Sequence, residues 1–295
     1  MKNKNYIITL IVVLGILIVV LLGGMFFFLG DHHSSWNFNI GFTGINEKVY
    51  EETFDNNYNL INVKSVMGDV EFKNSTDDKV KVVIYSKKDQ YSVDEKDDEL
   101  EIEITKGKCT FLCFNVKSDK IVVYLPSSYD KNININNDYG DIYIDNFKEA
   151  TFDIKEDCGD IKMKDASKAN IVNKYGDITV GKVNKITINE DCGDVSVEET
   201  KNIKVVNKYG DIKINKLSGY IKANNDCGDI NIKSINLTKD SSINDNLGDI
   251  KIGDTNEIYI DAKTSLGDVD INNNERKAKV VLTIKNSCGD IEVNN

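Results

Sequence analysis

The sequence predicts an all-β protein, a β-solenoid of about nine to ten coils preceded by one N-terminal transmembrane helix. Three observations predict it: an uncharged apolar segment near the N-terminus, a recurring Gly-Asp turn, and alternation of apolar and polar residues around each turn. The chain has 295 residues and a formal net charge of −11. Its acidic balance, with Arg276 as the only arginine, excludes a protein that binds the phosphate backbone of nucleic acids.

Residues 6–29 predict the transmembrane signal-anchor helix. They contain no charged side chain, and at about 1.5 Å per residue they would span roughly 36 Å, enough for a hydrocarbon layer of about 30 Å. Lys2 and Lys4 precede them, so the positive-inside rule makes residues 1–5 a cytoplasmic tip. The chain would be single-pass in the cell membrane with its C-terminal domain extracellular. A cleaved signal peptide is the alternative, but no alanine precedes Ala150 to form an A-x-A site.

The next two segments lead into the repeats. Residues 30–57 mix aromatic side chains with Gly, Asn and Glu, and we expect an irregular connector there. Residues 58–130 alternate between apolar and polar side chains over several short runs, which predicts strands that form the N-terminal β part of the repeat domain. The charged stretch from Lys87 to Glu99 is expected to be a solvated hairpin loop between two of these strands.

Residues 131–295 form the main repeat region. Gly-Asp followed by Ile or Val recurs ten times, and the last nine glycines are 17 to 22 residues apart. Glycine suits such turns because it adopts positive φ at no steric cost, and the following Asp can bond nearby backbone N–H groups. The predicted structural turns are at Gly68, Gly140, Gly159, Gly176, Gly193, Gly210, Gly228, Gly248, Gly267 and Gly289.

Alignment on these glycines predicts the core. Four positions, seven and five before each glycine and two and four after it, are apolar in 35 of 36 cases over the nine clustered repeats, with Ser241 as the exception. Positions between them are polar. Each repeat therefore contributes two short, half-buried strands.

Two folds fit these strands, and the residues before each glycine favour one of them. In a solenoid the coils stack at about 4.8 Å, which would place Lys174 between Asp157 and Asp191. In an antiparallel meander with Gly-Asp hairpins, the same residues would lie roughly 9–10 Å apart. The alternation of charge therefore favours the solenoid. It also predicts that Lys174→Asp destabilises the domain more than a charge change at the outward Lys162.

The six cysteines are candidates for redox or metal-binding groups. Cys158, Cys192, Cys227 and Cys288 occupy the position before a turn glycine, and we expect them to lean inward as small buried thiols. Two coils apart, the first three would be too distant for disulfides. Cys109 and Cys113 would form a local disulfide if a turn separates them but not if they share a strand, and both alternatives stay open.

The aspartates that follow the turn glycines are the other candidate site. Stacked carboxylates at about 4.8 Å repel one another by roughly 1 kcal/mol in water, so something must offset this. We expect turn N–H groups and nearby lysines to do so. A string of weak Ca²⁺ or Mg²⁺ sites is the sharper hypothesis, since carboxylates suit hard cations, and no other cofactor is expected. The candidates are Asp141, Asp160, Asp177, Asp194, Asp211, Asp229, Asp249, Asp268 and Asp290.

Catalytic motifs are missing from the sequence. It contains no G-x-S-x-G, Walker A or H-E-x-x-H motif, and its only histidines, His32 and His33, directly follow the apolar segment. The acidic residues follow the repeat evenly and do not form the irregular cluster expected of a glycosidase cleft. The sequence therefore predicts a protein that is not an enzyme.

Several segments together resemble a known family. They are INVKSVMGDVEF, DDKVKVVIY, DELEIEI, KIVVYLPSSYDKNININNDYGDIYI and the recurring GDI and GDV turns. Over about residues 58–295 the chain resembles a bacterial putative adhesin family of β-strand repeats, formally a domain of unknown function. The resemblance implies a membrane-anchored, right-handed β-helix-like surface domain, frequent in Gram-positive bacteria, and supplies no catalytic residues. The alternating Tyr and Cys before the turns depart from the family, which often has Ser there.

The sequence thus favours a non-enzymatic surface protein that acts as an adhesin or envelope-binding scaffold. Its expected partners are the membrane, through the anchor, and a cell-wall, host-surface or membrane-protein partner. The alternative is an envelope-stress sensor or regulator that acts through membrane partners. Only residues 1–5 would lie inside the cell, so such signalling would need lateral helix contacts.

Overall fold

The computed structural model describes residues 45–88, 90–105, 118–272 and 274–294, which belong to one compact unit, Phe42–Asn295. The described part is all-β, a β-solenoid of about eight turns. The predicted membrane helix at 6–29, the tip at 1–5, and Cys109 and Cys113 lie outside it. Within the described ranges, no helix has the length and apolar character needed to cross a membrane.

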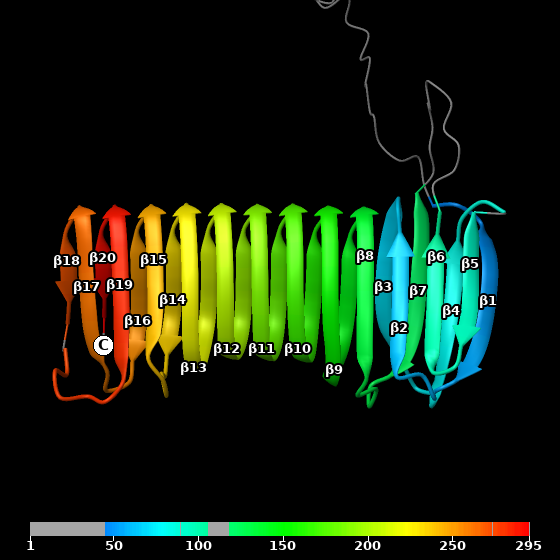
Figure 1. The fold of residues 1–295 in the computed structure, drawn as a ribbon, viewed down its shortest axis with the longest axis horizontal. Coiled ribbons are helices and arrows are strands. Elements are labelled where there is room, and N and C mark those ends of the chain that lie inside the picture. The colour runs from blue at the N-terminus through cyan, green and yellow to red at the C-terminus, as the bar shows by residue number, and fades with distance from the viewer. Residues whose placement is uncertain (1–44, 89, 106–117, 273, 295) are drawn as a thin grey trace, which may run out of the picture. The chain divides into compact units, whose positions relative to one another are not determined.

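The strands follow the chain in three groups (Figure 1). The N-terminal group comprises β1 (Lys48–Asp55), β2 (Leu60–Ser65), β3 (Gly68–Ser75), β4 (Lys79–Tyr85), β5 (Tyr91–Lys96), β6 (Glu99–Ile104), β7 (Asp119–Pro126) and β8 (Asn132–Tyr139). The central group comprises β9 (Ile142–Cys158), β10 (Ile161–Tyr175), β11 (Ile178–Cys192), β12 (Val195–Tyr209) and β13 (Ile212–Cys227). The C-terminal group comprises β14 (Ile230–Ile235), β15 (Ser241–Leu247), β16 (Ile250–Thr255), β17 (Tyr259–Leu266), β18 (Val269–Ile271), β19 (Val281–Cys288) and β20 (Ile291–Val293).

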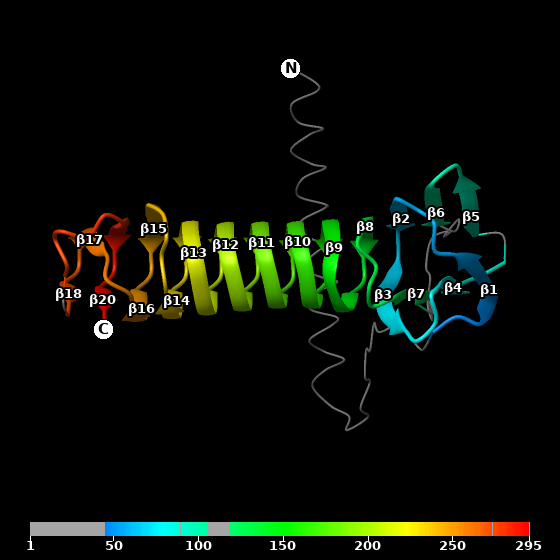
Figure 2. The same cartoon turned by 90° about the horizontal axis from the view of Figure 1, so that it is seen from below.

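Each central strand is one coil of the solenoid. β9 to β13 are 15 to 17 residues long, and each bends midway to pass from one face of the solenoid to the other (Figure 2). Neighbouring coils pair in parallel and in register, for example Ile161 with Ile178 and Tyr175 with Cys192. Parallel pairing confirms the stacked solenoid and excludes the meander, whose hairpins would be antiparallel. The right hand of the coil stays a prediction.

The core lies between the two faces. Sheet 1 contains the strand segments that follow each Gly-Asp turn, and sheet 2 contains those that precede it. The four predicted inward positions are buried in coil after coil, as with Ile203, Val205, Ile212 and Ile214, each at most 1% exposed. The exception, Ser241, is 8% exposed, and its hydroxyl accepts the Ile221 N–H and donates to a backbone carbonyl. The predicted core pattern is therefore confirmed in every coil except that of Gly267, where Val269 is exposed.

The N-terminal end of the solenoid is built from strands out of chain order. In sheet 1 the order is β1-β4-β7-β3-β9, and in sheet 2 it is β5-β6-β2-β8-β9. The pairs β1–β4, β4–β7 and β5–β6 are antiparallel and are not part of the parallel stack of coils. The solenoid has about eight turns, fewer than the nine to ten predicted. Two expectations are corrected here. The irregular connector at 30–57 contains β1, and the loop at 87–99 contains β5, because both segments pair with a strand edge.

The C-terminal end is also out of chain order. β19 pairs with both β15 and β17, and β20 pairs with both β16 and β18. The last turn of the chain, at Gly289, thus lies between those at Gly248 and Gly267. The coil of β17 and β18 is the terminal one, which leaves the predicted core residue Val269 41% exposed. Stacking in strict sequence order is therefore wrong for the last two repeats.

Candidate binding surface

The Gly-Asp turns form a column along one long edge of the solenoid. A Cβ atom placed on Gly176 would lie 2.2 Å from the carbonyl oxygen of Gly159 in the next coil, and one placed on Gly159 would lie 1.9 Å from that of Gly140. Gly176 also has a positive φ of 134°, whereas Gly159 does not need one. Close approach between coils, as well as conformation, therefore demands glycine in this column.

The aspartates after the glycines form a hydrogen-bonded ladder. The Oδ1 atom of each Asp accepts the backbone N–H of the Asp in the neighbouring coil, as from Asp194 to Asp177 at 2.9 Å and from Asp211 to Asp194 at 2.8 Å. The ladder follows the spatial order of the coils, because Asp249 accepts from Asp290 and Asp290 accepts from Asp268. Nine such bonds join Asp69, Asp141, Asp160, Asp177, Asp194, Asp211, Asp229, Asp249, Asp290 and Asp268.

Several of the second carboxylate oxygens are paired with neighbouring side chains. Lys162 lies 3.2 Å from Oδ2 of Asp160, Lys213 lies 3.2 Å from that of Asp211, and the Tyr143 hydroxyl donates to Asp141 at 2.7 Å. Turn N–H groups and nearby lysines therefore offset the repulsion, as expected. Among the described residues, no group of three or more His, Cys, Asp or Glu is arranged to hold a metal ion. Calcium binding at these aspartates stays a prediction.

The residues just before the turn glycines form an exposed row of alternating large and small side chains. Cys158, Cys192, Cys227 and Cys288 are free and exposed, so the expectation of buried thiols is wrong. The strand ends here, and the narrow space inside the turn is filled by the residue three before each glycine, which leaves the residue next to the glycine outside. In spatial order the row is Tyr139, Cys158, Tyr175, Cys192, Tyr209, Cys227, Leu247, Cys288 and Leu266.

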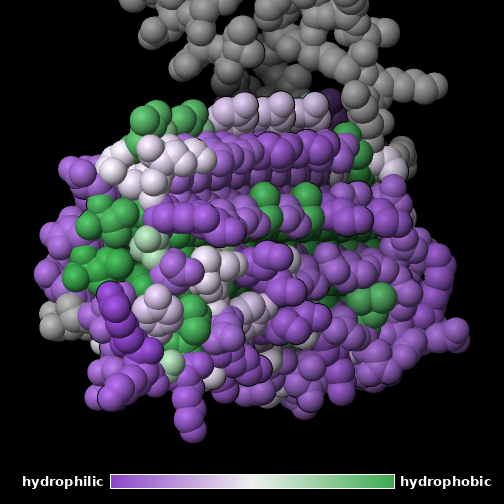
Figure 3. Space-filling model, turned by 60° about the vertical axis from the view of Figure 1, so that its left-hand side comes forward, coloured by the Kyte–Doolittle hydropathy of each residue, from purple (hydrophilic) through white to green (hydrophobic). Residues whose placement is uncertain are grey.

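The three tyrosines of this row are its most prominent aromatic groups. Tyr139, Tyr175 and Tyr209 are 54%, 60% and 62% exposed. They lie two coils apart, or roughly 9–10 Å. Leu247 and Leu266 continue the row at the C-terminal end, where Figure 3 shows hydrophobic surface gathered beside long polar rows. We call this row and the adjacent Gly-Asp column the turn edge.

A row of charges runs beside the tyrosines. Lys174 forms an ion pair with Asp157 at 2.6 Å, and Lys208 forms one with Asp191 at 2.6 Å. All four side chains are about half exposed. The predicted stacking of lysine beside aspartate is confirmed, although exposed pairs of this kind contribute little to stability.

Sequence reasoning missed a second polar column, inside the turn edge. At eight of the ten turns the side chain three residues before the glycine is an amide or a carboxyl group buried to 5% exposure or less, and at the two other turns it is Ser65 or Thr264. In spatial order they are Asn137, Glu156, Asn173, Glu190, Asn207, Asn225, Asp245 and Asn286. The recurrence of Asn, Glu or Asp at this position in eight of the ten turns is a usable signal, because surface positions elsewhere in the repeat vary in type.

Burial changes the acidity of this internal column, defined by the eight residues just named. It raises the pKa of Glu156 to about 8 and that of Glu190 to about 7, against hydrogen bonds that favour the charged forms. It also raises the pKa of Asp245 to about 6. These groups differ from the outer aspartates, which accept N–H groups at the protein surface.

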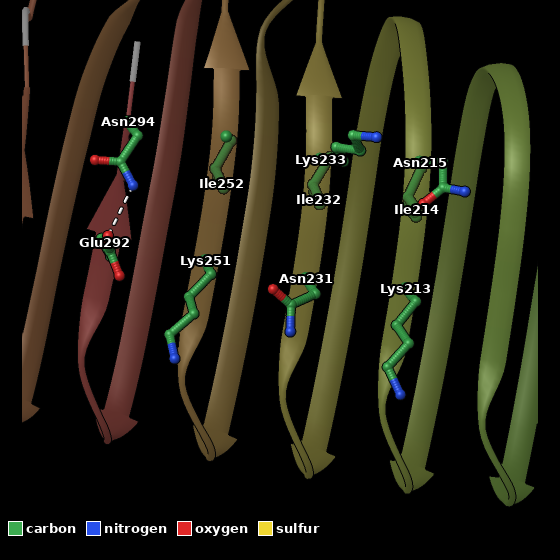
Figure 4. Close-up of a pocket in the computed structure, with 11 residues that line it drawn as sticks. Lys213, Ile214, Asn215, Asn231, Ile232, Lys233, Lys251, Ile252, Glu292 and Asn294 are labelled. Atoms are coloured by element: carbon green, nitrogen blue, oxygen red, sulfur yellow. Dashed lines mark hydrogen bonds between the residues drawn. The ribbon is translucent and has the colours of Figure 1, made fainter.

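Sheet 1 carries an open groove near its C-terminal end (Figure 4). Its volume is about 470 Å³, and the residues that line it lie on β13, β14 and β16 and on or next to β20. Lys213, Asn231, Lys251 and Glu292 lie in one register row across these strands. Glu292 accepts a hydrogen bond from Asn294 at 2.7 Å. The groove is open and combines apolar floor residues with lysines and amides, which can hold a ligand by hydrogen bonds, and no nucleophile in it is paired to a base.

The family follows from these features. A fold of stacked coils with Gly-Asp turns is that of a β-repeat domain, and the chain belongs to the Toastrack DUF4097 family, whose model matches residues 58–294. The resemblance stated from the sequence is thus confirmed. The family is a domain of unknown function. No curated protein matches the chain.

Solved structures resemble the chain at low identity. A putative adhesin from Bacteroides fragilis is 17% identical, with 85% of this chain and 100% of that chain covered and a TM-score of 0.43. A putative lipid binding protein from Parabacteroides distasonis is 13% identical, with coverage of 85% and 98% and a TM-score of 0.48. A putative adhesin from Parabacteroides merdae is 11% identical, with coverage of 84% and 98% and a TM-score of 0.44.

Proposed function

We propose that this chain is a non-enzymatic, membrane-anchored extracellular scaffold that binds an extended polymer of the cell wall or of a host surface along its turn edge. The observation that carries the proposal is the exposed row of Tyr139, Tyr175 and Tyr209. Aromatic rings bind by large apolar contact while their hydroxyl groups hydrogen-bond, which makes exposed tyrosines effective contact residues.

The geometry of the row favours a repeating ligand. The tyrosines recur every second coil, with one small exposed cysteine between each pair, and each is more than half exposed. The charged row of Asp157, Lys174, Asp191 and Lys208 lies directly beside them and supplies polar contacts. A polymer with its own repeat could therefore make the same contact several times, and several weak contacts in series add to a large avidity.

Presentation outside the cell rests on the sequence. The apolar residues 6–29 would anchor the chain, and Lys2 and Lys4 would hold its N-terminus in the cytoplasm. Protease added to intact cells should then remove the repeat domain while a cytoplasmic marker survives. Full protection of the repeat domain in intact cells, with digestion after lysis, would contradict this orientation.

The binding experiment replaces the tyrosines. The full chain in detergent and its variant with Tyr139, Tyr175 and Tyr209 changed to Ser are tested against purified wall polysaccharides, teichoic acids and host matrix proteins. We expect the wild type to retain at least one polymer and the triple variant to lose most of that affinity. Tyr220→Ser, a half-buried tyrosine away from the turn edge, is the control and should bind normally.

Two results would contradict the proposal. One is equal binding by the triple variant and the wild type to every polymer that the wild type retains. The other is no retention of any polymer combined with an altered envelope-stress response in cells that lack the protein, which would favour the regulatory alternative.

A further inference from the structure

The internal column contains more oxygen acceptors than hydrogen-bond donors. The amide nitrogen of Asn173 donates to the carbonyls of Gly159 and Gly176 at 3.4 and 3.0 Å, and that of Asn207 donates to Gly193 and Gly210 at 3.1 and 3.0 Å. These contacts occupy both amide protons of Asn207, whereas Asn173 also contacts Glu190, and Asn137 contacts Glu156, in hydrogen bonds that favour the charged carboxylates and only partly oppose the effect of burial. The Oδ1 atoms of both asparagines are buried and have no hydrogen-bond partner.

Glu156 and Glu190 of the internal column each have one paired and one unpaired carboxylate oxygen. Oε1 of Glu156 accepts the Cys158 N–H at 3.2 Å, and Oε1 of Glu190 accepts the Cys192 N–H at 3.1 Å. The Oε2 atom of each glutamate is buried without a partner. Each glutamate is also flanked in register by asparagines, Glu156 by Asn137 and Asn173, and Glu190 by Asn173 and Asn207.

A proton bound to the unpaired oxygen of each glutamate would remove the excess of acceptors. An unpaired buried carboxylate oxygen beside an unpaired amide oxygen is costly, because neither group has water or a donor to replace its hydration. One proton on Oε2 turns each such pair of acceptors into a donor and an acceptor. It also removes a charge from a site that is 1% exposed.

We propose that Glu156 and Glu190 are buried proton-binding sites, each of which donates from a neutral carboxyl group to the amide oxygen of a flanking asparagine, and that loss of these protons at alkaline pH loosens the surrounding coils. The column thus couples the stability of the solenoid to external pH. This inference concerns the interior of the turn edge and stands apart from the binding function of its surface.

The charges around the glutamates agree with the neutral form. Asp141 and Asp157 lie near Glu156, and Asp191 lies near Glu190; all three are negative and disfavour a further charge. On the flanking strands β8, β10 and β12, the side chains in register with the glutamates are amides. The lysines of those strands point outward, where Lys174 and Lys208 pair with Asp157 and Asp191.

The sign of the pH effect follows from the raised pKa values. The pKa of a glutamate is ordinarily 4.5, against about 8 for Glu156 and about 7 for Glu190 in the folded chain. Between these limits the folded chain holds more protons than the unfolded chain, so stability falls as the pH rises. The contribution is fully present below about pH 4.5 and is lost by about pH 8.

The test compares the melting temperature of the full chain in detergent from pH 5 to pH 9 with that of the Glu156→Gln, Glu190→Gln variant. A glutamine can donate to the same amide oxygen at any pH. We expect the double variant to melt about 2–4 °C or more above the wild type at pH 8 and close to it at pH 5. Glu149→Gln, at an exposed position of β9, should follow the wild type throughout.

A direct readout accompanies the melting curves. Infrared difference spectra of the wild type between pH 6 and pH 9 should show loss of the carbonyl stretch of protonated carboxyl groups, with a smaller loss in the double variant. This measurement needs no variant to establish whether buried carboxyl groups are neutral at pH 6. Absence of the band at pH 6 would overturn the proposal.

Two melting results would also overturn it. The first is equal pH dependence in the wild type and the double variant. The second is a melting temperature that Ca²⁺ raises and a chelator lowers at pH 8 in the wild type but not in the double variant, because the same oxygens would then hold a metal ion instead of a proton.

Discussion

At the scale of single residues, each position around the turn has one physical task. The glycine permits close approach of the coils, the aspartate after it bonds the next coil, and the residue three before it fills the space inside the turn. The residue immediately before it is left outside. These tasks explain why the repeat is so regular in sequence although its surface positions vary.

The glycine task predicts a large effect of a single methyl group. Gly176→Ala would place a Cβ atom 2.2 Å from the carbonyl oxygen of Gly159 at a φ of 134°. We expect it to lower the free energy of unfolding by about 2–3 kcal/mol, from overpacking and backbone strain together. Chemical denaturation of the full chain in detergent measures this loss. Lys185→Ala, an exposed change in the same region, serves as the control, and equal stability of the two variants would refute the close-approach argument.

The aspartate ladder predicts that an acceptor oxygen matters more than a charge. Oδ1 of Asp177 accepts the Asp194 N–H at 2.9 Å. Asp177→Ala should therefore destabilise the chain by about 1 kcal/mol, the ordinary loss of one hydrogen bond, while Asp177→Asn should cost less because its amide oxygen can accept the same bond. Denaturation curves for both variants decide the point. A larger loss in the asparagine variant would mean that the charge itself is required, as in a cation site.

The exposed charge row predicts a salt-dependent effect. Lys174→Asp would place three aspartates in succession with Asp157 and Asp191. Lys162 lies between the uncharged Tyr143 and Thr179 in register, so Lys162→Asp removes one ion pair, with Asp160, without placing a charge between two aspartates of its own row. We expect the melting temperature to fall more for Lys174→Asp than for Lys162→Asp at low ionic strength. The difference should nearly vanish at about 1 M salt, where the Debye length is about 3 Å. Equal effects at low salt would contradict the stacking of this row.

At the scale of strands, period-2 alternation predicted the inward positions of the coils because a half-buried strand must alternate. The same rule failed at the residue before each glycine, where the strand ends and alternation no longer fixes the side of the chain. It therefore placed Cys158 and its equivalents inside. It also passed over the buried Asn137, Glu156 and Asn173, since polar residues are ordinarily assigned to the surface.

Strand order was the second feature beyond reach of the sequence. Spacing between turns shows that coils stack, but it does not say which coil lies next to which. The pattern of the row before the glycines held a hint. In chain order Leu247 is followed by Leu266, whereas in spatial order Cys288 lies between them and the alternation of large and small side chains is unbroken.

The turn at Gly289 lies between those at Gly248 and Gly267, so the last two coils should unfold together. β17 and β18 pair only with β19 and β20 among the described strands, so removal of residues 281–295 deletes one coil and should release a second, that of β17 and β18. Hydrogen exchange of the chain that lacks residues 281–295, measured in detergent, should show loss of protection over residues 259–271, while β9 to β13 stay protected. Persistent protection of 259–271 would indicate that this coil pairs with β15 and β16 instead.

At the scale of the whole domain, the molecule is a stack of coils whose turn edge carries tyrosines and thiols on its surface and a column of amides and acids beneath it. The outer row supplies the surface for the proposed binding, and the inner column couples stability to pH. The outer row and the inner column both require that the coils stack in parallel and in the spatial order of their backbone pairs.

The native cysteines allow that claim to be measured. With Cys109 and Cys113 changed to Ser, the remaining thiols can be left in pairs and spin-labelled in the full chain. Cys192 and Cys227 are two coils apart, and the spatial order makes Cys227 and Cys288 two coils apart as well. We expect the distance between spin labels to be equal for the two pairs, because the backbones of both pairs are about 9–10 Å apart. A Cys227–Cys288 distance that exceeds the Cys192–Cys227 distance by the spacing of one coil, about 4.8 Å, would contradict the spatial order.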